Sequence, residues 1–213
     1  MIRSVVRRGM AAVAAAALLV GAGVVAGSGT AAAVYVSPVT AEQTVGNISV
    51  VRGGLGDVYG LGARPAVRIG GDITFTTTFS VREGDERLVT RITDHGPAGF
   101  EYVPGSATVE YRDASGAVQR ESVTPEVGAG AVTVRAPGTG WPLSAAPAKG
   151  VVLTVTYRAP LLSIPSEVDG GGVTFDVAGR GEGLGWTAMG LPVDVNLPKS
   201  VDSLGSSSFI FGS

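Results

Sequence analysis

Cysteine is absent from this 213-residue sequence, and histidine occurs once, as His95. Without cysteine the chain can form no disulfide and no thiolate metal site, and both cysteine-dependent catalysis and thiol redox chemistry are excluded. A single histidine would need carboxylate partners to hold a metal ion, and no spacing in the sequence supplies them. We therefore expect no metal site and no cofactor, and a fold that depends on packing alone.

Lysine is also scarce, since only Lys149 and Lys199 occur, and the remaining basic residues are arginines. The formal net charge is −2, and it becomes about −5 if residues 1–33 are removed, because that segment holds three arginines and no acidic residue. Nucleic acids and anionic lipid surfaces bind clustered basic side chains. The mildly acidic balance therefore excludes nucleic acid as an expected partner.

The N-terminal segment has the three parts of a secretory signal peptide. Three arginines precede an apolar run from Met10 to Ala26, and small residues follow up to Ala33. The run is shorter than the roughly 20 residues that a membrane-spanning helix needs, and it is rich in Ala and Gly. We expect cleavage after residue 33, no stable membrane span afterwards, and a secreted, extracellular or envelope-associated protein.

The rest of the chain has the period-two pattern of β-strands, interrupted by Gly, Pro and Asp. Asp72 to Val81 is the clearest strand, because apolar residues alternate with Thr and Ser; Arg87 to Thr93 is expected as its hairpin partner. Further strands are predicted over 47–52, 106–112, 118–124, 132–134, 151–157, 173–177 and 188–197. This gives an all-β sandwich of about nine strands over residues 47–197, between an N-terminal lead (34–46) and a flexible tail (198–213).

Three segments resemble one family. Gly71 to Phe79 is similar to its opening Gly-Asp and Thr-rich strand, Asp94 to Val109 to its "Asp, Pro-Ala-Gly, aromatic, Val-Pro-Gly-Ser-Ala" segment, and Ala148 to Tyr157 to its closing strand. The family is the conserved-repeat, immunoglobulin-like domain of unknown function, numbered eleven, of bacterial secreted and surface proteins. The resemblance implies an immunoglobulin-like sandwich, spans roughly residues 65 to 160, and transfers no catalytic residue.

Catalytic and metal-binding alternatives have little support in the sequence. His95 lies beside Asp94, but no Gly-x-Ser-x-Gly motif follows residue 33 to provide a nucleophile, so we interpret it as a turn residue. The acidic loop 83–86 and the turn 169–172 lack the ligand spacing of a calcium-binding loop, and we interpret both as solvated. Lys149 lies where a lysine of a covalent Lys–Asn cross-link could lie, and an ordinary lysine is favoured there.

The two tryptophans are the weak candidates for binding. Trp141 is expected in a loop and Trp186 just before a strand; either could stack on a sugar, although a core or interface position is favoured. We expect a structural or adhesive surface protein without catalytic activity, whose partner is cell-wall polysaccharide or another surface protein. The alternative is an extracellular carbohydrate- or wall-binding module that uses these tryptophans, and a weaker one is a hydrolase with a carboxylate pair.

Overall fold

The computed structural model describes residues 39–59, 64–113, 115–128, 130–145 and 148–196. These residues form 18 β-strands and no helix, so the chain is all-β but has more strands than the nine expected. The additional strands are mostly short, with two to six residues each, and many contain Gly or Pro, which hides the period-two pattern. The expected signal peptide (1–33) and the tail (198–213) lie outside the described residues.

The first of three sheets has seven strands in the order β1-β2-β5-β14-β8-β9, with β7 paired to the end of β14. All its pairings are antiparallel. Its strands are β1 (Thr40–Val45), β2 (Ile48–Gly56), β5 (Asp72–Val81), β7 (Glu101–Tyr102), β8 (Thr108–Arg112), β9 (Val118–Ser122) and β14 (Val151–Arg158).

The second sheet also has seven strands, and β6 lies at its centre. Strands β11 and β12 pair with one edge of β6 and β16 with the other. Its strands are β6 (Arg87–His95), β10 (Glu126–Gly128), β11 (Ala131–Arg135), β12 (Trp141–Ala145), β13 (Ala148–Lys149), β16 (Gly172–Val177) and β17 (Gly181–Trp186).

The third sheet is smaller and has the order β15-β18-β4-β3. Its pairing between β18 and β4 is parallel, and the other two are antiparallel. Its strands are β3 (Val58–Tyr59), β4 (Pro65–Arg68), β15 (Ser166–Asp169) and β18 (Pro192–Asn196).

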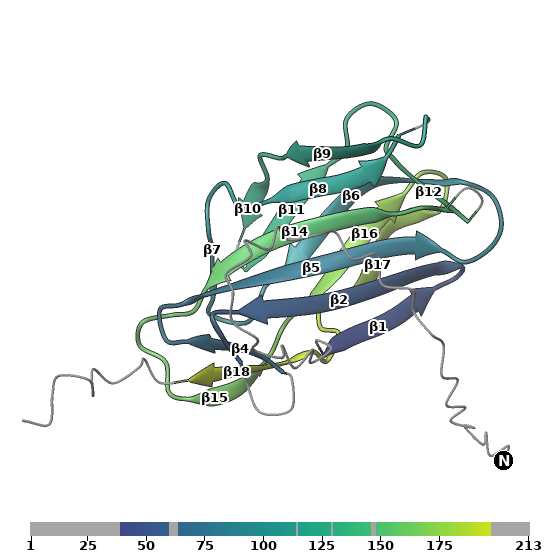
Figure 1. The fold of residues 1–213 in the computed structure, drawn as a ribbon. Coiled ribbons are helices and arrows are strands. Elements are labelled where there is room, and N and C mark those ends of the chain that lie inside the picture. The colour runs from purple at the N-terminus through teal and green to yellow at the C-terminus, as the bar shows by residue number, and fades with distance from the viewer. Residues whose placement is uncertain (1–38, 60–63, 114, 129, 146–147, 197–213) are drawn as a thin grey trace, which may run out of the picture. The chain divides into compact units, whose positions relative to one another are not determined.

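The two large sheets face each other across one hydrophobic core (Figure 1). The rings of Phe79 on β5 and Phe175 on β16 meet edge to face at 5.1 Å between centroids. Along β5 the burial alternates strictly, with Ile73, Phe75 and Phe79 at most 1% exposed. The period-two pattern of residues 72–81 thus buries one face of the strand, as expected.

The structure confirms the predicted bounds of β5. The prediction that β5 forms a hairpin with the next strand, β6, is wrong. Strand β5 pairs with β2 and β14 in the first sheet, whereas β6 pairs with β11, β12 and β16 in the second. The polar loop 82–86 therefore carries the chain from one sheet to the other. Period two indicates which face of a strand is buried, but it does not identify the neighbouring strand.

Two other segments also differ from expectation. Residues 40–45, which were expected to belong to the lead, form the edge strand β1. Strand β2 runs on through residues 53–56, where a glycine-rich connection was expected. A Cβ at Gly56 would lie 1.7 Å from the carbonyl oxygen of Ala66, so glycine at this position lets β2 pass close to β4.

Candidate functional site

The segment from Asp94 to Ser106 carries the chain from the second sheet to the first. Strand β6 ends at His95, and β7 already pairs with β14 of the first sheet. Gly99 and Gly105 have positive φ angles of 79° and 78°, and the amide of Phe100 donates to the carbonyl of Pro97 at 3.1 Å. The two predicted turns are therefore present, and together they make the predicted corner between the sheets.

Asp94 points into the core and forms an ion pair with Arg52 of β2. The side chains of Asp94 and Arg52 are 1% and 0% exposed, respectively. Arg52 Nη1 donates to one carboxylate oxygen of Asp94, and Nη2 donates to the other at 3.2 Å. The hydroxyl of Tyr157 on β14 donates to Asp94 Oδ1 at 2.7 Å. The Asp94 carboxylate thus accepts three hydrogen bonds from two residues of the facing sheet.

The guanidinium of Arg52 is satisfied on its other sides as well. Nη1 donates to Thr77 Oγ1 at 3.0 Å, and Nε and Nη2 donate to the carbonyl of Gly170 at 3.3 and 3.1 Å. Its Cζ lies 4.3 Å from the ring centroid of Phe75, within the range of a cation–π contact. A buried ion pair is tolerated only when its remaining donors and acceptors are paired, and this one meets that condition.

Burial and the adjacent carboxylate of Asp94 raise the pKa of the Tyr157 hydroxyl, which stays protonated and keeps donating its hydrogen bond to Asp94.

Glycines leave room for the buried cluster of Arg52, Asp94 and Tyr157. A Cβ at Gly96 would lie 2.5 Å from the Tyr157 ring, and a Cβ at Gly171 would lie 1.8 Å from the carbonyl oxygen of His95. The glycine run 170–172, interpreted as a solvated acidic turn, therefore packs closely against the end of β6.

His95 and Asp94 do not form a catalytic pair. As neighbours on a strand they project to opposite faces, and His95 Nε2 lies 3.0 Å from Thr174 Oγ1 on β16. His95 is the last residue of β6 rather than part of the turn that follows. Partial burial lowers the pKa of His95, since desolvation outweighs the attraction of Asp94. Both residues are engaged in bonds between strands.

The acidic residues that the structure describes do not form a metal-binding cluster. Among the described residues, no group of three or more His, Asp and Glu side chains could hold a metal ion. Asp169 accepts from the amides of Gly171 at 2.7 Å and Gly190 at 3.0 Å, and Lys149 donates to Glu86 at 2.8 Å. Asp169 thus stabilises the turn, and Lys149, for which an ordinary lysine was favoured over a cross-link, forms an ion pair with Glu86.

The tryptophans differ in exposure. Trp141 is 1% exposed and lies within β12 rather than in a loop, so its ring offers no face to a sugar in this conformation. Trp186 ends β17 and is half-buried against the core. The structure does not bring the two together into one platform, and sugar binding through Trp186 stays a prediction.

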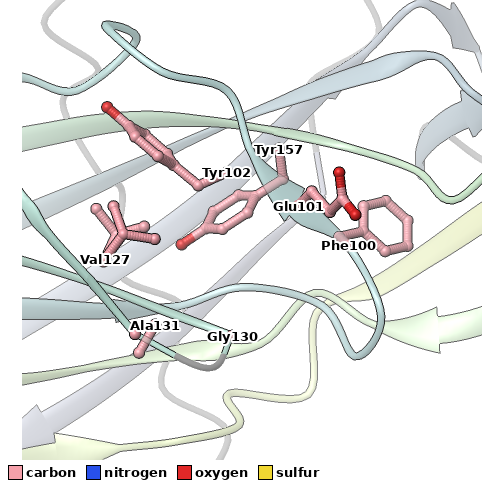
Figure 2. Close-up of a pocket in the computed structure, with 9 residues that line it drawn as sticks. Phe100, Glu101, Tyr102, Val127, Gly130, Ala131 and Tyr157 are labelled. Carbon is pink, nitrogen blue, oxygen red and sulfur yellow. The ribbon is translucent and has the colours of Figure 1, made fainter.

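A pocket of about 270 Å³ lies beside the corner segment, between β7 and the β10–β11 hairpin (Figure 2). Phe100, Tyr102 and Tyr157 line one side, and Val127 of β10 lies opposite. The hydroxyl of Tyr102 is buried and has no hydrogen-bond partner among the described residues. Of the described residues that line the pocket, only Glu101 is charged, and it is exposed. Sequence patterns missed this pocket, because β10 has no apolar alternation.

Both β7 and β10 lie at sheet edges. Among the described strands, β7 pairs only with β14 and β10 only with β11. An edge strand has one row of backbone amide and carbonyl groups without strand partners, and extended polypeptides bind to such edges. Val127, which faces the pocket, is 59% exposed. The pocket therefore combines apolar walls, one exposed carboxylate and open backbone edges.

Comparisons with known proteins identify the fold but no family. No protein-family model matches the chain, and no curated protein matches it. Membership of the conserved-repeat family therefore stays a prediction. The described residues contain no helix long and apolar enough to cross a membrane.

A similar solved structure is that of a Corynebacterium diphtheriae protein described as membrane-anchored, with a TM-score of 0.50 and 11% identity. The alignment covers 76% of this chain and 39% of that one, so the chain matches well under half of the Corynebacterium protein. At this identity the likeness extends to the fold alone.

Two looser matches are binding domains of bacterial proteins, and the first of these proteins is described as a surface protein. The collagen-binding domain of RspB from Erysipelothrix rhusiopathiae has a TM-score of 0.36 at 14% identity, over 67% of this chain and 44% of that one. The KRT10-binding region domain of pneumococcal PsrP has a TM-score of 0.37 at 14% identity, and the alignment covers 73% of this chain and 92% of that one. The likeness does not extend to what either protein binds.

Proposed function

We propose that this chain is a secreted or cell-surface, immunoglobulin-like β-sandwich with a structural or adhesive role, and that it acts without catalysis. The buried cluster of Arg52, Asp94 and Tyr157 supports the scaffold part of the proposal. In the family-like segment, Asp94 and His95 are the residues best placed in the sequence for chemistry. Asp94 instead bonds to Arg52 and Tyr157 of the facing sheet, and His95 bonds to Thr174 within its own sheet. Hydrogen bonds and an ion pair between the two sheets would stabilise an exported protein that has no disulfide.

The adhesive contact is assigned to the pocket between β7 and β10. Its apolar walls fit a single apolar side chain of a partner polypeptide, and the exposed carboxylate of Glu101 would accept a hydrogen bond from a basic or amide group of the same partner. The open edges of β7 and β10 would pair with the backbone of the same partner. The preferred partner is therefore another surface protein that presents an extended segment with a basic or amide side chain.

Cell fractionation with matched variants tests this function. Val127→Asp places a charge in the pocket, whereas Val118→Asp places one on β9, an edge strand that does not line the pocket and where Val118 is 51% exposed. Both exposed substitutions should change stability by no more than about 0.5 kcal/mol. The tagged full chain and the Val118→Asp variant should be retained in the envelope fraction, while Val127→Asp should move to the medium.

Three results would contradict the proposal. Recovery of the unaltered chain in the medium would argue against a surface role, and equal retention of Val127→Asp and Val118→Asp would argue against the pocket. Release of reducing sugar from purified wall polysaccharide by the unaltered chain would contradict the absence of catalysis.

A further inference from the structure

A second surface, distinct from the pocket, lies on the loop between β14 and β15. Leu161, Leu162 and Ile164 in this loop are 80%, 99% and 82% exposed. Pro160 and Pro165 flank them and restrict the backbone of the loop. Single exposed apolar residues are ordinary, but three within four positions make a patch of the kind that is covered by another apolar group.

This apolar loop lies close to the end of β18, the last described strand. The amide of Ile69 donates to the carbonyl of Asn196, the last residue of β18, at 2.9 Å. A Cβ at the next residue, Gly70, would lie 2.7 Å from Leu161 Cδ2. The turn at residues 69–70 thus contacts both the end of β18 and the apolar loop, so β18 ends beside the patch.

The sequence beyond Asn196 contains a matching apolar cluster, Phe209-Ile210-Phe211. The residues between Asn196 and Phe209 can span roughly 40 Å when extended, which is ample to return to a loop next to their starting point. Residues 203–213 carry no charged side chain. The cluster can therefore reach the loop without bringing a charged side chain into contact with it.

The charges around the apolar loop are already paired. Arg158, which precedes the loop, donates to both carboxylate oxygens of Asp72 at 2.7 and 2.9 Å, and Glu167, which follows it, is paired with Arg64. Among the described residues next to the loop, these charged side chains are already paired, so they would attract an anionic lipid or a charged polypeptide only weakly. An uncharged apolar segment suits this surface best.

We propose that Phe209, Ile210 and Phe211 pack on Leu161, Leu162 and Ile164 of the same chain. The same-chain arrangement is favoured over a second copy because a short connection within one chain gives an effective concentration of the order of millimolar. Bound in this way, the segment closes the apolar loop and holds the end of the chain against the small third sheet.

The absence of cysteine allows a direct test by disulfide trapping in the full chain. Ser163→Cys with Gly212→Cys places one thiol beside each apolar cluster and leaves all six apolar residues intact. With copper phenanthroline as oxidant at micromolar protein, the pair should form an intramolecular disulfide at least tenfold faster than in the same background carrying Leu162→Asn. Monomeric mobility and an intact mass about 2 Da lower identify the product, since a disulfide forms only between thiols that approach closely.

Three outcomes would overturn the proposal. Equal trapping rates with and without Leu162→Asn would mean that the loop does not hold the segment. Covalent dimers as the main product at micromolar protein would assign the contact to a second copy. Flotation of the unaltered chain, but not of Leu162→Asn, with phosphatidylcholine vesicles would make a lipid surface the occupant of the loop.

Discussion

Arg52 on β2 and Asp94 on β6 form a fully buried ion pair that joins the two facing sheets of the sandwich. The pair is closed on all sides, because Tyr157 and Thr77 lie on the first sheet beside it and Gly170 supplies a carbonyl from the turn before β16. Removing one member of such a cluster leaves the others buried without partners. The stability of this chain should therefore depend strongly on a few polar residues.

The hydroxyl of Tyr157 should contribute measurably to this cluster. Tyr157→Phe removes a donor to the Asp94 carboxylate while it keeps the ring packed against Phe75 and Tyr102. Since hydrogen bonds to charged groups contribute roughly 1.5–3 kcal/mol, the free energy of unfolding should fall by about 2 kcal/mol. Urea denaturation followed by tryptophan fluorescence measures the loss. An unchanged midpoint would mean that Asp94 does not need this donor.

Gly171 should tolerate no side chain. Gly171 and Gly116 both have positive φ angles, 76° and 86°, but a Cβ at Gly116 would meet nothing within 4 Å, whereas one at Gly171 would collide with the carbonyl of His95. Gly116→Ala should therefore cost only the backbone strain, roughly 1–2 kcal/mol. Gly171→Ala should cost more than about 4 kcal/mol or prevent folding. Thermal unfolding of both variants compares them, and similar costs would argue against the close packing at this turn.

Stability should fall as the pH falls, and His95 should cause part of this change. The pKa of His95 is lower in the folded state than the ordinary 6.5, so the unfolded chain binds more protons below that pH. The contribution is fully present above pH 6.5 and is lost as the pH falls through 6.5 towards the folded-state pKa. His95→Gln should flatten the dependence of the unfolding free energy on pH between about 7 and 5. The same slope in both proteins would contradict this assignment.

Two surface carboxylates should act in the same direction at lower pH. Hydrogen bonds from Arg158 lower the pKa of Asp72, and those from Arg135 lower the pKa of Glu126. A lowered carboxyl pKa gives stability that is present above the unfolded-state value and is lost as the pH falls through the folded-state value. Carboxyl-carbon NMR titration should show both groups titrating below their ordinary ranges. Because both are exposed, their effect on stability should be small and should decrease with added salt.

Alternation was sufficient to predict the long strands. Strand β5 has the predicted bounds, and β14 and β16 agree with the predicted segments to within one residue. Long strands with one buried face leave the strongest period-two pattern. Short strands such as β12 do not, because Gly140 and Pro142 around Trp141 indicate a loop, while pairing with β6 makes the segment a strand.

The buried cluster leaves a weaker signal in the sequence. Arg52 shares a strand face with Ile48 and Val50, and Asp94 shares one with Ile92, so each charge interrupts an apolar face. Two opposite charges at such positions suggest an internal ion pair, but which strands face each other depends on the topology. The pocket between β7 and β10 was not predictable, because it arises where strands from two different sheets end side by side.

The scaffold role of Asp94 is tested most directly by a double-mutant cycle with Arg52, measured by equilibrium denaturation. Asp94→Leu and Arg52→Met should each destabilise the chain by roughly 3–5 kcal/mol, because each leaves a buried charge without its partner, and the double variant should recover most of that loss. Additive losses in the double variant, or single variants as stable as the unaltered chain, would contradict the conclusion that this pair holds the two sheets together.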